Sequence, residues 1–110
     1  MQNLFDYLLS MGGLHDSELR SIEWSTTERR VVISIGDLYA NFEGLPEYKG
    51  EVNGEIVLSN VTRLDANLDL AEKVNIFEML PREGSENIVV ISLSPTGRIE
   101  IEFGTASHPE

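Results

Sequence analysis

The chain has 110 residues, and its 19 acidic and eight basic residues give it a formal charge of −11 at pH 7. This length fits a single domain, because chains of this size bury one core and rarely two. Hydrophobic residues make up 41% of the chain, close to the globular average, so the sequence predicts a folded protein and excludes a disordered one. So negative a surface repels nucleic acid and anionic lipid and attracts basic proteins.

An amphipathic helix is expected at the amino terminus. Asn3 and Asp6 have the spacing of a capping box, and Gly12-Gly13 ends the helix. Five apolar residues share one broad face: Leu4, Phe5, Leu8, Leu9 and Met11. A helix of about two to three turns is unstable alone, so this face must dock on other elements.

Period-two alternation of apolar residues, typical of strands, begins at Glu18. It predicts five strands marked by these residues: Ile22 and Trp24; Val31, Ile33 and Ile35; Ile56 and Leu58; Leu64, Ala66, Leu68 and Leu70; Val74 and Ile76. The second strand is expected to continue through Leu38 to Phe42 with a bulge at residues 36–37, and residues 43–50 to form a mobile loop. A helical turn at residues 71–73 is an open alternative. Residues 88–93 and 99–103 predict a terminal hairpin, and Trp24 and Phe103 are expected in the core.

Together these elements predict one domain over residues 1–110, with a frayed tail at residues 104–110. The expected fold class is α+β, mainly β. One amino-terminal helix packs on an antiparallel meander of six to seven strands, curled or partly closed into a barrel.

Two predicted strands carry acidic residues at alternate positions, Asp65 and Asp69 on one and Glu100 and Glu102 on the other. Side chains two positions apart project from the same side of a strand, so these carboxylates are expected to form exposed acidic faces. Such a face either keeps the protein soluble or docks a basic partner. Docking would be anchored by aromatic residues near the mobile loop: Tyr39, Phe42 and Tyr48.

A polar segment containing His15, Asp16 and Glu18 connects the helix to the first strand. Its imidazole and carboxylates could bind a ligand or a divalent metal, or act as general acid and base. Asp and Ser also favour turns, and adjacent residues of an extended segment point to opposite sides, so a structural role is the stronger interpretation. The sequence contains no nucleophile motif and no cysteine, and it predicts no catalytic residues, no metal site and no cofactor.

The chain also lacks the apolar stretch of about 20 residues that a membrane span needs. Asp6 interrupts the apolar amino-terminal run, which is not typical of a signal peptide. The absence of cysteine suits a reducing compartment. These features predict a cytoplasmic protein that binds neither membranes nor nucleic acid.

Three segments resemble a set of small uncharacterised bacterial proteins, some of which look like immunity proteins of polymorphic toxin systems. The segments are Leu14-His15-Asp16-Ser17-Glu18-Leu19, Gly54-Glu55-Ile56-Val57-Leu58-Ser59-Asn60-Val61 and Asn75-Ile76-Phe77-Glu78. The resemblance implies a protein that neutralises a toxin by binding it.

The leading hypothesis is therefore a non-enzymatic acidic module that binds a basic protein partner, such as a toxin domain. The alternative is a small ligand-binding or metal-dependent enzyme domain that uses the polar segment around His15. Self-association into a homo-oligomer is a third possibility, because small sheets often pair through their edges.

Overall fold

The described residues of the chain form one short helix, two turns of 3-10 helix and eight strands. A computed structural model describes residues 3–70 and 73–109. The elements are α1 (Leu4–Ser10), η1 (Gly12–Leu14), β1 (Glu18–Ser25), β2 (Arg30–Gly36), η2 (Ala40–Phe42), β3 (Gly54–Ser59), β4 (Arg63–Leu68), β5 (Asn75–Pro81), β6 (Ile88–Ser94), β7 (Gly97–Glu102) and β8 (Thr105–Ser107). The helical turn considered at residues 71–73 includes residues 71–72, which lie outside the described residues. No helix in the described part is long and apolar enough to cross a membrane.

The predicted amino-terminal helix is confirmed, with one change in its buried face. The Asn3 side-chain oxygen accepts a hydrogen bond of 2.8 Å from the backbone N–H of Asp6 and caps α1. Tyr7 and Leu8 are buried, whereas Leu9 is 63% exposed. Successive residues of a helix are about 100° apart, so Leu9 is turned away from the face that Leu8 buries. The expectation that Leu9 shares this face is wrong.

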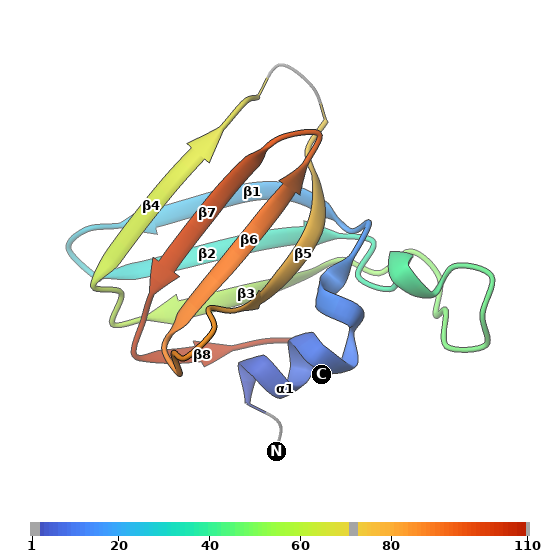
Figure 1. The fold of residues 1–110 in the computed structure, drawn as a ribbon, viewed down its shortest axis with the longest axis horizontal. Coiled ribbons are helices and arrows are strands. Elements are labelled where there is room, and N and C mark those ends of the chain that lie inside the picture. The colour runs from blue at the N-terminus through green and yellow to red at the C-terminus, as the bar shows by residue number, and fades with distance from the viewer. Residues whose placement is uncertain (1–2, 71–72, 110) are drawn as a thin grey trace.

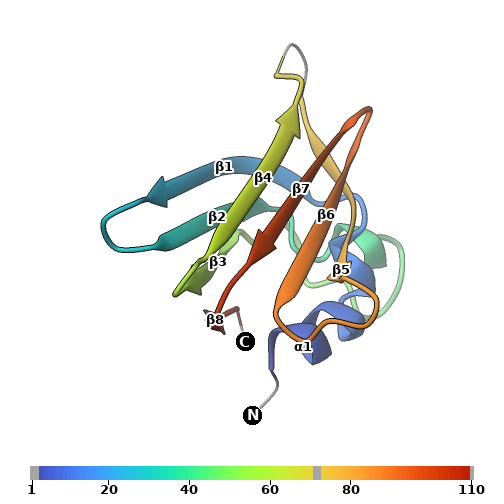
Figure 2. The ribbon, with the colours of Figure 1, turned by 60° about the vertical axis from the view of Figure 1, so that its left-hand side comes forward.

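All eight strands belong to one antiparallel sheet in the order β4-β7-β6-β5-β1-β2-β3-β8. β1 and β5 share a single paired position, Glu18 opposite Asn75, so the sheet opens there into two four-stranded layers. Figures 1 and 2 show β4, β7 and β6 crossing in front of β1 and β2, with α1 at the end of the layers near β8. The sheet does not close into a barrel.

The core lies between the two layers. Many of its fully buried aliphatic residues come from β2 and β3 on one side and from β6 and β7 on the other, among them Val31, Ile33, Ile56, Leu58, Ile91, Ile99 and Ile101. Phe103, 7% exposed, also belongs to the core, as expected. The ring of Phe5 meets the Phe103 ring edge-on, with centroids 6.1 Å apart, and this contact helps to fix α1 to the layers.

The α+β, mainly β fold class is confirmed, but two segments differ from prediction. β2 ends at Gly36, and the chain then turns through Asp37, with φ of 55°, into η2. A left-handed residue breaks the extended chain, so the predicted continuation of this strand to Phe42 is wrong. The tail predicted to fray contains an eighth strand, β8, which pairs with β3. Alternation over three residues is too short to reveal such a strand in the sequence.

Candidate functional site

The polar segment around His15 is tied to β5. Nδ1–H of His15 donates to the carbonyl oxygen of Phe77 at 2.6 Å, and the two rings meet edge-on. This bond leaves Nε2 to face Asp16, whose carboxylate oxygen lies 3.5 Å away. The backbone N–H of Asp16 donates to the carbonyl of Ile76. The histidine and both backbone contacts therefore hold the η1–β1 connection against the sheet.

Glu18 does not join this histidine in a shared site. Its carboxylate binds Arg20 Nε at 2.9 Å and Lys73 Nζ at 3.2 Å. The hydrogen bond from Arg20, followed by that from Lys73, holds the pKa of Glu18 below its ordinary value. Within the described residues, no three His, Asp or Glu side chains converge in a way that could hold a metal ion.

We expect added divalent cations to change the melting temperature of the natural protein by no more than about 1 °C. The same should hold for the His15→Ala variant. The reason is that Glu18 already binds two cations and that the described residues contain no group of three His, Asp or Glu side chains that could hold a metal ion. His15→Ala itself should cost about 0.5–1.5 kcal/mol through the lost hydrogen bond to Phe77. Thermal melts with and without zinc, manganese and magnesium salts measure both effects. A stabilisation by metal that disappears in His15→Ala would revive the metal-dependent alternative.

The acidic faces predicted on two strands form one surface, because β4 and β7 are neighbours in the sheet. Asp65 lies opposite Glu100 in the register. Glu100 is bound by Arg82 at 2.8 Å and by Arg98 at 3.1 Å, and only 19% of its side chain is exposed. Arg98 lies two positions before Glu100 on β7 and so projects from the same side of that strand. Arg82 could not be placed there from the sequence, because it follows β5, which lies two strands away from β7.

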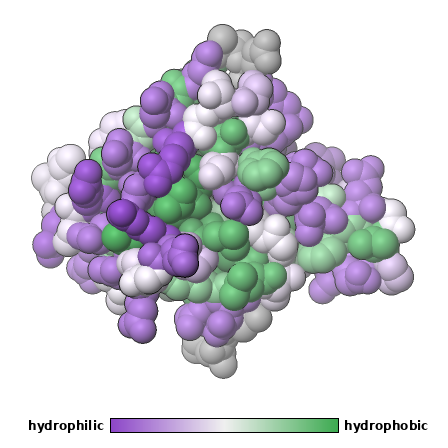
Figure 3. Space-filling model, in the orientation of Figure 1, coloured by the Kyte–Doolittle hydropathy of each residue, from purple (hydrophilic) through white to green (hydrophobic). Residues whose placement is uncertain are grey.

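The remaining charges of this surface are also mixed in sign. Glu102 accepts a hydrogen bond from the Thr62 hydroxyl and lies opposite Arg63 in the register. Asp69 follows the end of β4 and is exposed. Figure 3 shows hydrophilic residues on this side of the molecule and a band of hydrophobic residues beside them, over β6. On the β4–β7 surface Glu100 is therefore ion-paired, whereas Asp65 and Asp69 are exposed as expected.

A second acidic surface lies at residues 37–53, here called the acidic loop, which projects from the body beside η2 (Figure 1). Its four carboxylates belong to Asp37, Glu43, Glu47 and Glu51. No Lys or Arg of the described residues is within ion-pairing distance of any of them. The pKa of Tyr48 is raised, first by its loss of solvent and then by Asp37, Glu43 and Glu51. Three of the four carboxylates of the loop therefore lie close enough to Tyr48 to act on its ionisation.

The aromatic residues expected as anchors do gather on the acidic loop. Tyr39 and Phe42 are partly buried and pack against the core, and Tyr48 is half-buried. The ammonium group of Lys49 lies 5.5 Å from the centre of the Tyr39 ring. The loop and β4 lie on opposite sides of the molecule (Figure 1), so the predicted aromatic anchors and the β4–β7 carboxylates do not form one site.

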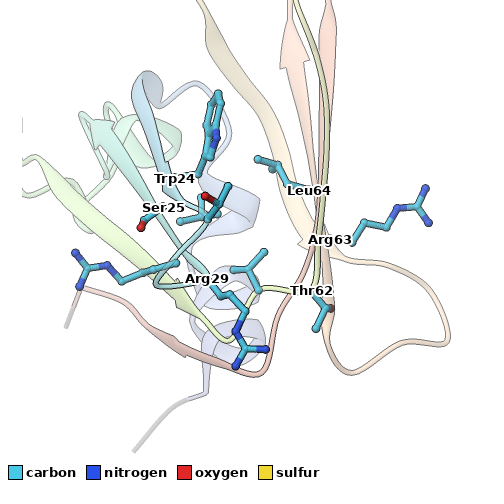
Figure 4. A pocket seen from close by; sticks show the side chains of 10 residues that line it. Trp24, Ser25, Arg29, Thr62, Arg63 and Leu64 are labelled. Carbon is cyan, nitrogen blue, oxygen red and sulfur yellow. The ribbon is translucent and has the colours of Figure 1, made fainter.

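The structure also contains a groove that the sequence did not indicate. It consists of two hollows, of about 390 and 220 Å³, that share Trp24 of β1 and Leu64 of β4. Figure 4 shows the Leu64 side chain pointing from β4 toward Trp24 across the smaller hollow. Trp24 is 63% exposed, so its expected place in the core is wrong. We call this feature the β1–β4 groove.

The exposure of Trp24 has a structural cause. Trp24 pairs with the buried Val31 of β2 and so faces the inner side of its layer, as the alternation predicted. The two layers diverge at this end, so the residues that the structure describes leave 63% of Trp24 exposed. Alternation identifies the side of a strand but not the distance to the next layer, so no sequence signal could have identified the groove.

No family model, no curated protein and no solved structure matches this chain. The class that its fold and surfaces define is an acidic, mainly β domain with an unpaired acidic loop and an apolar groove.

Proposed function

We propose that this protein is a non-enzymatic binding module that docks on a basic protein through its acidic loop. The observation that carries the proposal is the group of four carboxylates that form no ion pair among the described residues, beside the partly buried rings of Tyr39 and Phe42. An unpaired charge cluster increases the rate at which an oppositely charged partner associates, and a neighbouring aromatic surface supplies contact area. The acidic loop thus replaces the β4–β7 surface as the candidate docking site.

The basic partner proposed is a toxin domain, which the protein would neutralise in the cytoplasm as an immunity-type inhibitor. A net charge of −11 favours association with a basic active-site groove, such as that of an enzyme acting on nucleic acid. Growth of cells that produce the partner with and without this protein would test neutralisation. Restored growth is the expected result, and unchanged toxicity would contradict the toxin assignment.

The docking site is tested by removing charge from the acidic loop. We expect the triple variant Glu43→Gln, Glu47→Gln, Glu51→Gln to associate with the partner about tenfold more slowly at low salt, because electrostatic attraction acts mainly on the association rate. The partner is first captured from a native lysate at low salt, and its association rate is then measured at rising ionic strength. Added salt should remove most of the difference between variant and natural protein.

A matched control changes the same number of charges elsewhere. Asp65→Asn, Glu83→Gln, Glu86→Gln removes three exposed carboxylates that lie outside the acidic loop. This control should associate nearly as fast as the natural protein. Equal slowing of both triple variants would show that only net charge matters, and an association rate that ignores salt would exclude electrostatic docking.

A further inference from the structure

The β1–β4 groove is bordered by two strand edges without a neighbouring strand. β1 pairs with β5 at Glu18, and the backbone N–H of Leu19 donates to the carbonyl of Val74, so among the described residues its edge on that side has no strand partner from Ser21 to Ser25. Within the same described residues, β4 is the outermost strand of the sheet and pairs with β7 alone. Unpaired edges present backbone N–H and C=O groups that can bind an added strand.

The surface between these edges is apolar. The larger hollow is lined mainly by aliphatic side chains from β1, β4 and the residues that follow β4, among them Leu19, Ile22, Leu64, Leu68 and Leu70. Trp24 and Leu70 are 63% and 76% exposed, which is unusual for side chains of this size. Contiguous exposed apolar surface of this kind marks a binding site more often than scattered exposed residues do.

The charge of the groove is opposite to that of the molecule. Arg20 lines the larger hollow, and Arg29, Arg30 and Arg63 line the smaller one. These are half of the eight basic residues of the chain, and none of its 19 acidic residues is among the described residues that line either hollow.

Not all four arginines are equally available to a ligand. Arg20 is held by Glu18, and the Arg63 side chain points away from the hollow in Figure 4. Arg29 has no ion pair within the described part of the chain, and Arg30 has only a 3.9 Å contact with Glu28 in which both side chains are more than half exposed. An exposed pair of this kind contributes little, so an incoming carboxylate can displace it. Positive charge is therefore available beside Trp24.

We propose that the β1–β4 groove binds an extended segment of a partner protein whose apolar residues alternate along the strand and whose acidic side chain lies beside Arg29 and Arg30. In an extended segment every second side chain points to the same side, so one row fills the apolar hollows while the backbone pairs with a free strand edge. The carboxylate then meets the guanidinium groups next to Trp24. This site is separate from the acidic loop, and its ligand is acidic whereas the partner of the loop is basic. The proposal can therefore be tested independently of the proposed function.

Trp24 makes the test direct, because it is the only tryptophan of the chain. The probe is a synthetic, end-blocked octapeptide of alternating leucine and threonine with an aspartate at each end. Burial of the indole by the peptide should move its fluorescence emission to shorter wavelengths and protect it from acrylamide quenching. The matched control peptide carries lysine in place of each aspartate and should bind about tenfold more weakly at 0.15 M salt, where charges more than about 8 Å apart are largely screened.

Charge reversal in the protein separates recognition of the peptide's charge from non-specific hydrophobic binding. Arg29→Glu, Arg30→Glu should reverse the preference, so that the lysine peptide binds more tightly than the aspartate peptide. The control Arg98→Glu makes the same kind of charge change on the outer side of β7 and should preserve the natural preference. Arg29→Gln is a milder variant that should only reduce the preference, and circular dichroism verifies that each variant is folded.

Three results would overturn the proposal. One is an emission spectrum that neither peptide changes. Another is equal affinity for both peptides in the natural protein. The third is protection of the indole from quenching without any peptide. That protection would come either from dimers, seen by sedimentation as the protein concentration rises, or from added dodecanoate. Those outcomes would assign the groove to a second copy or to a small amphiphile.

Discussion

Leu8→Ala should lower the free energy of unfolding by about 2–5 kcal/mol. Leu8 is fully buried on the side of α1 that faces the sheet, so its truncation loses apolar burial and leaves a cavity. A seven-residue helix cannot persist without its packing, so α1 should loosen together with its contacts to the sheet. Urea unfolding followed by circular dichroism measures the change.

The adjacent residue supplies the control. Leu9→Ala removes the same side chain from the same helix, but Leu9 is 63% exposed. Its effect should stay within about 0.5 kcal/mol, because exposed substitutions rarely change stability more. Comparable losses in the two variants would mean that the helix does not pack on the sheet through the Leu8 side.

Local patterns predicted the elements of this fold well. The terminal hairpin of β6 and β7 was found because its strands alternate and its connection contains Pro and Gly, all within a short stretch of sequence. The capped helix at Asn3 was found for the same reason. Each of these signals involves residues close together in the chain, and propensity and hydrogen bonding act at that range.

The arrangement of the strands could not be predicted in this way. Opening of the sheet at Glu18 and Asn75 depends on a pairing between segments more than fifty residues apart. β8 was missed because its partner, β3, supplies the edge that makes it a strand. Non-local pairing depends on which surfaces become buried together, and a single sequence does not record it.

The candidate sites show the same division. The sequence placed Asp65 and Glu100 on strand faces correctly, and alternation along β7 also puts Arg98 on the side of Glu100. Arg82, by contrast, follows β5 and becomes a neighbour of Glu100 only through the fold. The acidic loop was accessible to prediction because its carboxylates and aromatic residues are close together in the chain. The β1–β4 groove was not, because β1 and β4 approach each other only in space.

The two candidate surfaces give the molecule an uneven distribution of charge. The four carboxylates of the acidic loop form no ion pair among the described residues, and the groove is lined by arginines. At low salt the attraction of the acidic loop for a basic partner reaches over long distances. The arginines of the groove attract a carboxylate only at short range, where salt screens little. A basic partner and an acidic extended segment could therefore bind the same molecule at once, each at its own surface.

Tyr7→Phe should remove most of the loss of stability that the natural protein shows between pH 10 and 12. Tyr7 is 5% exposed, and its hydroxyl oxygen has no hydrogen-bond partner among the described residues. Burial, and to a smaller extent the charge of ionised Tyr39, raises the pKa of Tyr7 from 10.0 to about 12. The folded protein therefore keeps a proton that the unfolded chain has already lost above pH 10.

The sign of the effect follows from this difference. The contribution is fully present below pH 10 and falls as the pH rises toward 12, by about 2–3 kcal/mol for a shift of this size. At pH 7 the phenylalanine variant should be equal to the natural protein or up to about 1 kcal/mol more stable, because it no longer buries an unpaired hydroxyl. The ring itself stays, so its stacking on His108, with centroids 4.5 Å apart, is kept.

Urea unfolding at pH 8 and pH 11.5 compares the natural protein, Tyr7→Phe and the control Tyr48→Phe, whose ring belongs to the acidic loop and not to the core. Tyr7→Phe should flatten the fall of stability with alkaline pH clearly more than Tyr48→Phe, because the pKa of Tyr48 is also raised but its ring is not part of the core. If the Tyr48 variant flattens it equally, or if the Tyr7 variant loses stability with pH as steeply as the natural protein, the buried phenol is not the group whose ionisation unfolds this chain.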